Sequence, residues 1–231
     1  MNNIQRLLAI IAHPDDETYR AGGTLALLAQ NGAQVWVLCA TRGERGIAKL
    51  SPEDAGSIRQ TELVCACRTL GIEPPRFLDY EDGTLSQGDG EQAIGQIARA
   101  IRELRPQALL TWPPDGVSGH PDHSAVSRWT DEAWRLAADP AYQTEGLQPH
   151  TAVSLYHIVI PHSLAAALEM THLNTVPDEA VTLTVDVSAV WDTKMAAIHC
   201  HRSQMVNSPI LDAPEARQRL FLGTEYFRRS L

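Results

Sequence analysis

The sequence predicts an α/β protein with a Rossmann-like, three-layer fold and a mostly parallel central sheet. Segments with strand character alternate with segments with helix character along the chain, which is the pattern of βαβ units with right-handed crossovers. The first apolar run, RLLAIIA at 6–12, contains no polar residue after Arg6. An unbroken apolar run of this length is typical of a strand that is buried on both faces of a parallel sheet.

The other expected strands are short apolar runs that are rich in β-branched and aromatic residues. They are AQVWVLCAT at 33–41, RFLDY at 76–80, ALLTW at 108–112, SLYHIVI at 154–160 and VTLTVDV at 181–187. Most of them follow a segment with helical character, as crossover connections between parallel strands require.

Helices are expected at 20–31, 51–70, 90–104, 122–138 and 191–202. The clearest is 51–70, because Ser51 can cap its N-terminus, Pro52 suits its first position and Gly71 follows its end. In 90–104, isoleucine, alanine and leucine recur at helical spacing. The segment 139–180 has the least regular pattern.

Length and composition indicate one ordinary globular domain, 1–231, with 44% hydrophobic and 20% charged residues. The formal net charge of −9 argues against a general nucleic-acid or anionic-membrane surface. The apolar run near the N-terminus is too short to span a membrane and has no cleavage site behind it. We therefore expect a cytoplasmic protein. A homo-oligomer is possible on general grounds.

The cysteines are Cys39, Cys65, Cys67 and Cys200, and no C-x-x-C motif is present. Cys65 and Cys67 would point to different faces of the helix expected at 51–70. We therefore expect buried reduced thiols rather than a disulfide framework or a thiolate metal site.

Two loops carry the tripeptide His-Pro-Asp, each shortly after a predicted strand. HPDDE at 13–17 follows the first strand, and HPDH at 120–123 follows the strand at 108–112. In the commonest doubly wound order these two strands are neighbours where the order reverses, and ligands bind beyond their carboxyl ends. The two loops are therefore expected to face each other across one crevice.

The side chains of these loops form a plausible metal site. His13, Asp16 and His123 would supply two imidazoles and a carboxylate, a set typical of catalytic zinc with one position open to water. Fe²⁺ accepts the same ligands. Asp15 would remain beside the metal as a base for the water proton, which a bound Zn²⁺ makes easier to remove.

The second loop contributes two further candidates. His120 could donate to a developing oxyanion or protonate the leaving amine, and Asp122 could orient a neighbouring imidazole. A single His-Pro-Asp is more often only a turn, so the prediction depends on the pairing of the loops. H-E-x-x-H and G-x-G-x-x-G are absent, which argues against a zincin and a dinucleotide site.

The paired motifs resemble those of the PIG-L/LmbE-like N-acetylglucosaminyl deacetylases. Further similarities span most of the chain: TRGERG at 41–46, Arg59 with Glu62, Ala66 and Leu70-Gly71, Lys194 with His201 and Ser203-Gln204, and EYFR at 225–228.

The resemblance implies a zinc-dependent hydrolase with a Rossmann-like fold and one metal per chain. Such an enzyme removes the N-acetyl group from a small N-acetylglucosamine (GlcNAc) conjugate, for example GlcNAc-malate, and releases acetate and a free amine. This places the chain in the class of bacillithiol- or mycothiol-pathway deacetylases. By motif position the ligands are His13, Asp16 and His123, the base is Asp15, the oxyanion or acid residue is His120, and Asp122 supports the histidines.

Four residues are candidates for substrate binding. Glu44 and Arg59 match family positions that contact the sugar or its aglycone, and His201 matches a position near the pocket. Arg42, a loop arginine, could recognise an anionic aglycone. The alternatives are an Arg59–Glu62 ion pair on a helix surface and, for His201, a contact with a helix C-terminus.

Two other functions fit the same residues. One is a metal-dependent amidase that acts on a different N-acyl substrate. The other is a non-catalytic module that binds a metal or a nucleotide, although the spare carboxylate of Asp15 argues against it, because a structural zinc site uses four protein ligands and needs no base.

Overall fold

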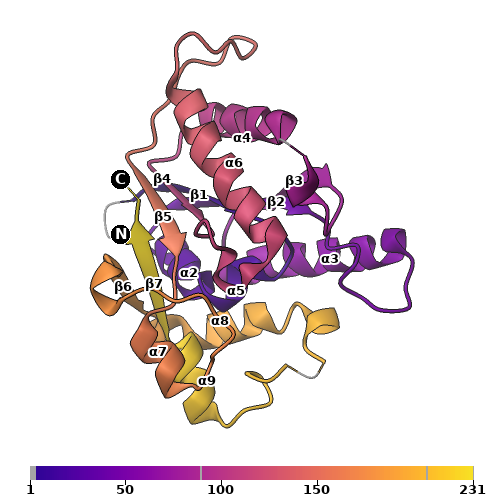
Figure 1. The fold of residues 1–231 in the computed structure, drawn as a ribbon, viewed down its shortest axis with the longest axis vertical. Helices are drawn as coiled ribbons and strands as arrows, with labels where there is room; N and C mark the ends of the chain where they lie inside the picture. Colours follow the sequence, from indigo (N-terminus) through magenta and orange to yellow (C-terminus); the bar gives the residue numbers. More distant parts are fainter. Residues whose placement is uncertain (1–3, 89, 207, 231) are drawn as a thin grey trace.

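The computed structural model describes residues 4–88, 90–206 and 208–230. The predicted domain, 1–231, also includes residues 1–3, 89, 207 and 231, which lie outside the described residues. Within the described part, one seven-stranded sheet has the order β3-β2-β1-β4-β5-β7-β6 (Figure 1). Its strands are β1 (Arg6–Ile11), β2 (Gln34–Thr41), β3 (Arg76–Tyr80), β4 (Ala108–Thr111), β5 (Ser154–Ile158), β6 (Leu183–Asp186) and β7 (Thr224–Arg229).

Strands β1 to β5 pair in parallel, which confirms the predicted fold class. β1 lies between β2 and β4, with Leu7 opposite Ala108 and Ala9 opposite Leu110. The two loops that carry His-Pro-Asp therefore leave the same edge of the sheet from neighbouring strands. This is the point where the strand order reverses and where ligands bind in such sheets.

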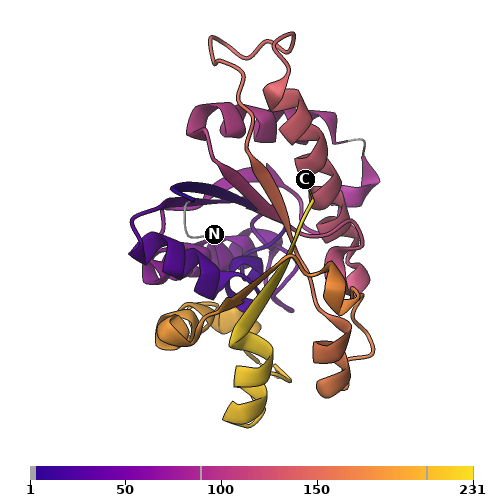
Figure 2. The same ribbon diagram turned by 90° about the vertical axis from the view of Figure 1, so that its left-hand side faces the viewer.

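Helices cover both faces of the sheet, which confirms the three layers. The helices are α1 (Asp16–Tyr19), α2 (Gly22–Gln30), α3 (Pro52–Leu70), α4 (Glu91–Leu104), α5 (Gly116–Gly119), α6 (Pro121–Ala138), α7 (His162–Ala167), α8 (Trp191–Ile198) and α9 (Glu215–Leu222). α4 and α6 lie on one face, and α2, α3 and α8 lie on the other (Figures 1 and 2). No helix in the described ranges is long and apolar enough to cross a membrane.

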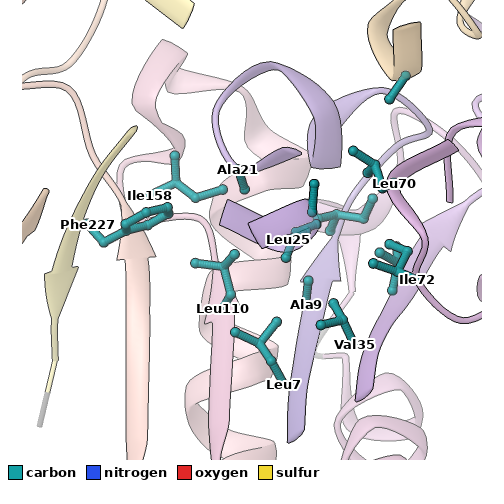
Figure 3. Close-up of a cluster of buried hydrophobic side chains, with 14 of the residues drawn as sticks. Leu7, Ala9, Ala21, Leu25, Val35, Leu70, Ile72, Leu110, Ile158 and Phe227 are labelled. Carbon is teal, nitrogen blue, oxygen red and sulfur yellow. The ribbon is translucent and has the colours of Figure 1, made fainter. Parts of the chain in front are cut away.

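Alternate residues of β1 enter two separate hydrophobic clusters, as the pleat of a strand requires. Leu7 and Ala9 pack with Leu25 of α2 and Leu70 of α3 (Figure 3). Leu8 and the other residues of opposite parity pack against α4 and α6. Both faces of β1 are therefore buried in apolar surroundings. The chain becomes polar only after the strand ends, where the first His-Pro-Asp loop begins.

The signals that predicted α3 act as expected. The Ser51 hydroxyl accepts a hydrogen bond from the Asp54 amide at 3.1 Å, and Gly71 ends the helix with a φ of 74°. α3 thus has the predicted bounds within one residue. The helix starts on the side of the sheet where the site lies, and Arg59, two turns into it, reaches Asp15.

The C-terminal strand was not predicted. β7 runs antiparallel between β5 and β6, so the last strand in the sequence is inserted inside the sheet. Its sequence TEYFRR contains one fully buried apolar residue, Phe227. Long-range pairing, rather than a local apolar run, therefore defines this strand.

The prediction that all four cysteines are reduced is wrong. Cys39 and Cys67 are free and buried as expected, but Cys65 of α3 forms a disulfide with Cys200, which follows α8. The packing of α8 against α3 brings their Cα atoms to 5.7 Å, within the range that a disulfide spans. A separation of 135 residues in the sequence gave no sign of this proximity.

The disulfide should contribute to stability, because it restricts the unfolded chain across a long loop. We expect Cys65→Ser, or reduction by dithiothreitol, to lower the free energy of unfolding by about 2–4 kcal/mol, measured by urea denaturation. Dithiothreitol should have no further effect on the Cys65→Ser protein. A further loss of stability in that variant would contradict the assignment of this pair.

Candidate active site

A cavity of about 480 Å³ lies beyond the carboxyl ends of β1 and β4. Three of its residues come from the first His-Pro-Asp loop and two from the second. The remaining lining side chains are Arg45, Arg59 and Asp82. The volume is within the range of small-molecule sites. The structure thus brings together the two loops that the sequence analysis paired.

Asp16 is the most strongly held carboxylate of the site. Its Oδ2 accepts hydrogen bonds from the backbone amides of Ala12 and His13, both at 3.0 Å, and from Nε1 of Trp112 at 3.1 Å. Its Oδ1 lies 3.3 Å from Nε2 of His123. Burial alone would raise the pKa of Asp16, but the nearby imidazoles and amides outweigh it and hold the pKa well below its usual range.

The two histidines are oriented by groups behind them. Nδ1 of His123 lies 3.2 Å from the carbonyl oxygen of Gly116, so Nε2 faces Asp16. Nε2 of His13 lies 3.2 Å from both Asp122 Oδ2 and Asp82 Oδ1, which leaves Nδ1 on the side of Asp16. Ring nitrogens held in this way by carbonyls and carboxylates are typical of metal-ligating histidines.

The electrostatics of these residues fit a cation. Burial lowers the pKa of His13, but the hydrogen bonds to Asp122 and Asp82 raise it to about 10. The pKa of His123 is also raised, since the carboxylate of Asp16 outweighs its burial. The surrounding acids therefore favour a positive charge at this position. Protonation of the two imidazoles supplies that charge, and a bound metal ion would supply it in their place.

His13, Asp16 and His123 can hold a metal, because their ligand atoms lie within 4.8 Å of one another. A second set, His13 with His120 and Asp122, meets the same limit. In that set both oxygens of Asp122 already accept an amide, Oδ2 from Gly83 at 2.7 Å and Oδ1 from Leu85 at 3.1 Å, whereas the amide and indole donors of Asp16 all reach its Oδ2. The first set therefore fits the ion better.

Asp15 lies beside this set and lines the cavity. One of its carboxylate oxygens, Oδ2, is 3.1 Å from the guanidinium of Arg59. Burial raises the pKa of the carboxyl group to about 6, and Arg59 opposes the rise. Such a carboxylate is ionised at neutral pH and still basic enough to accept a proton.

His120 is arranged as a hydrogen-bond donor. Its Nδ1 accepts from the backbone amide of Asp122, at 3.2 Å, where α6 begins. Burial and the neighbouring imidazoles of His123 and His13 lower the pKa of His120, so the ring is neutral and its Nε2 carries the hydrogen. A neutral imidazole with this tautomer can donate to an oxyanion.

The expected substrate-binding residues divide into two groups. Arg59 lines the cavity. Arg42 and Glu44 line a separate pocket, and the guanidinium of Arg42 pairs with Asp79 at 2.7 Å. His201 lies behind the cavity, where it is fully buried and its Nε2 is 2.7 Å from Glu17 Oε1.

The Arg59–Glu62 ion pair considered from the sequence is replaced by other partners. Arg59 donates to the carbonyl oxygens of Pro14 and Gly43 besides its pairing with Asp15. The Glu62 carboxylate instead accepts from the amide and the hydroxyl of Ser203, at 2.7 and 2.6 Å.

The sequence analysis did not identify two residues that contact the candidate metal ligands His13 and His123. Asp82 follows β3 in a turn, and its Oδ2 accepts from the amide of Arg45 at 3.0 Å while Oδ1 faces His13. Trp112 follows β4, and its ring stacks on His123 with centroids 4.3 Å apart. A carboxylate and an aromatic residue close to the carboxyl ends of β3 and β4 were visible signals, although neither belongs to a His-Pro-Asp motif.

Comparison with known proteins identifies the family. A family model described as PIG-L, GlcNAc-PI de-N-acetylase, matches residues 8–134, which is more than half of the chain. The chain belongs to the PIG-L family. The resemblance inferred from the sequence motifs is thereby confirmed.

Relatives and solved structures agree with the PIG-L assignment. A 1D-myo-inositol 2-acetamido-2-deoxy-alpha-D-glucopyranoside deacetylase from Thermobispora bispora is 32% identical, over 96% of this chain and 87% of its own. The fold is shared with a N,N'-diacetylchitobiose deacetylase from Pyrococcus horikoshii at a TM-score of 0.80, 22% identity, and coverage of 98% and 84% of the two chains. A conserved protein from Thermus thermophilus matches at a TM-score of 0.76 with 30% identity, over 98% and 95%.

These findings make the chain a hydrolytic N-deacetylase of the PIG-L family. The alternative of a non-catalytic metal- or nucleotide-binding module is therefore set aside.

Trp112→Phe should weaken metal binding. The phenyl ring can still stack on His123, but Asp16 loses the donor from Nε1. We expect the affinity for Zn²⁺ to fall about tenfold, as is typical when a ligand loses its outer hydrogen bond, measured by competition with a chromogenic chelator. The matched control is Trp134→Phe, which loses a similar bond from Nε1 to the carbonyl oxygen of Ala152. Equal affinities in the two variants would contradict the role of Trp112.

Proposed function

We propose that the protein hydrolyses the N-acetyl group of a small GlcNAc glycoside, with His13, Asp16 and His123 as the ligands of one divalent cation. The observation that carries the proposal is the placement of Asp15 and His120 on the same cavity as this ligand set. A base and a neutral donor beside a two-histidine, one-carboxylate site are the groups that metal-assisted amide hydrolysis requires.

Zn²⁺ is the proposed ion, with Fe²⁺ as the alternative, and when bound it polarises the amide carbonyl and makes a water proton easier to remove. Asp15 takes that proton, and Arg59 keeps the carboxylate ionised beforehand. Nε2–H of His120 donates to the carbonyl oxygen as negative charge develops on it. The same carboxyl group of Asp15 can return the proton to the departing nitrogen, so that acetate and a free amine are released.

Asp122 and Asp82 have supporting roles in this proposal. Asp122 holds His13 from behind and fixes the turn after β3 through the amides of Gly83 and Leu85. Asp82 reaches the same imidazole and also lines the cavity. Asp122 is therefore a positioning residue, whereas Asp82, although largely buried, also lines the cavity.

The inositol glycoside named for the curated relatives is the first proposed substrate. GlcNAc-malate is the second, because the guanidinium of Arg45 lies at the cavity and pairs with the exposed carboxylate of Glu81, at 2.6 Å, in a half-exposed ion pair. An anionic aglycone could replace Glu81 at this arginine. Glu44 would act indirectly, since it accepts from the amide of Asp82.

A substrate panel tests the proposal. We expect acetate release from GlcNAc-inositol, GlcNAc-malate or N,N'-diacetylchitobiose, and loss of that activity after chelation and its return with Zn²⁺ or Fe²⁺. Arg45→Ala should raise KM for the malate glycoside and leave KM for the inositol glycoside unchanged. Release of acetate only from a non-sugar amide would favour the more general amidase.

Asp15→Asn tests the base. The amide keeps the shape of the side chain but cannot accept the water proton, so we expect kcat to fall about 10²–10⁴-fold with the metal content of the purified protein unchanged. Normal turnover in this variant would show that another group takes the proton.

The pH dependence should report the same carboxyl group. Burial raises the pKa of Asp15 to about 6, whereas Arg59 and a bound cation act in the opposite direction. As the pH falls through this pKa the base becomes protonated, so kcat/KM should decline by about tenfold per pH unit on the acid side. The midpoint of this limb should lie at pH 6 or lower, and a midpoint above pH 7 would exclude Asp15 as its source.

A further inference from the structure

Glu17 is a buried acid that the proposed reaction does not use. Its side chain is 1% exposed and does not line the cavity. One carboxylate oxygen, Oε2, accepts the backbone amide of Asp15 at 3.0 Å. The other, Oε1, lies 2.7 Å from Nε2 of His201. The carboxylate thus connects the backbone of Asp15 to a histidine that is distant in the sequence.

The backbone of Asp15 needs such support. Its φ is 107° and its ψ is −28°, a conformation that side-chain-bearing residues rarely adopt. Backbone strain of this kind persists only where surrounding contacts impose it. The amide of Asp15 is held by Glu17, and its carbonyl oxygen accepts from the amide and the hydroxyl of Thr18, at 3.0 and 2.8 Å. These contacts determine where the carboxylate of Asp15 projects.

His201 contacts Glu17 and is shielded from the cavity. The residue is fully buried, and its Nδ1 has no hydrogen-bond partner among the described residues. Its segment is anchored to α3 on both sides, by the Cys65–Cys200 disulfide and by the Ser203 hydrogen bonds to Glu62. A buried carboxylate needs a hydrogen-bonded partner of this kind.

We propose that Glu17 and His201 form a positioning pair for the catalytic base, in which His201 orients the Glu17 carboxylate and Glu17 holds the Asp15 backbone in its strained conformation. The inference depends on the proposed role of Asp15. It gives a function to the last acid of the HPDDE motif and replaces the expected substrate contact of His201 with an indirect one. Neither side chain touches the substrate.

The proposal predicts a loss of kcat without a loss of metal or substrate binding. In Glu17→Ala we expect kcat to fall about 10–100-fold, the usual cost of removing an outer-layer partner, with KM and Zn²⁺ content near those of the unmodified protein. Glu17→Gln retains an oxygen that can accept the Asp15 amide, so it should recover most of this loss. A merely structural role would lower thermal stability in both variants without this difference in kcat.

A double-mutant cycle separates the two possible roles of His201. If His201 acts through Glu17, His201→Ala should lower kcat in the unmodified protein and have no effect on kcat in the Glu17→Ala background. If His201 contacts the substrate itself, the two losses should multiply and KM should rise. The second result would overturn the pair.

Arg102→Ala is the control for lost stability, because it removes a buried charged side chain of α4 that donates to the carbonyl oxygens of Ala137 and Tyr142, on the other side of the sheet from the positioning pair. It should lower the melting temperature at least as much as Glu17→Ala while changing kcat much less. Equal losses of kcat in the two variants would overturn the positioning role.

Two results separate this proposal from the proposed function. An active Asp15→Asn protein would refute the proposed base. An inactive Asp15→Asn together with a fully active Glu17→Ala would refute the positioning pair alone.

Discussion

The carboxylate of Asp16 is the interaction on which the arrangement of the site depends. It joins the end of β1, through the amides of Ala12 and His13, to the end of β4, through Trp112, and to the start of α6, through His123. Because Oδ2 takes the two amides and the indole, Oδ1 is left to face Nε2 of His123. The same contacts that hold the loops together therefore leave one oxygen of Asp16 available to the proposed metal ion.

The consecutive acids of the first loop are tolerated because each has a different partner. Asp15 meets Arg59 of α3, Asp16 meets His123 of α6, and Glu17 meets His201 after α8. Burying one carboxylate without a partner would be costly. The fold can therefore bury three consecutive acids only because a different segment supplies a cationic or imidazole partner for each of them. This also explains how the pKa of Asp15 is raised while that of its neighbour Asp16 is lowered: the first is dominated by burial, the second by imidazoles and amides.

Local patterns were sufficient for most of the fold. The apolar run at 6–12 and the capping signals around α3 depend on neighbours in the sequence, and the structure has both elements at nearly the predicted bounds. β7 and the Cys65–Cys200 disulfide were missed for the same reason, since each exists only because distant segments pack together. The antiparallel insertion of β7 between β5 and β6 left no mark in the periodicity of its own residues.

The sequence by itself determined which chemical groups the site contains: two paired motifs with three imidazoles and several carboxylates, placed after strands that adjoin in a doubly wound sheet. Only the tertiary structure decided how these groups are used. It oriented the imidazoles of His13 and His123 toward Asp16, brought Asp82 and Trp112 against these rings, and buried His201 against Glu17. The physical reason is that residue types and spacing are local properties of the chain, whereas hydrogen-bond partners and burial arise from contacts between residues that are far apart in the sequence.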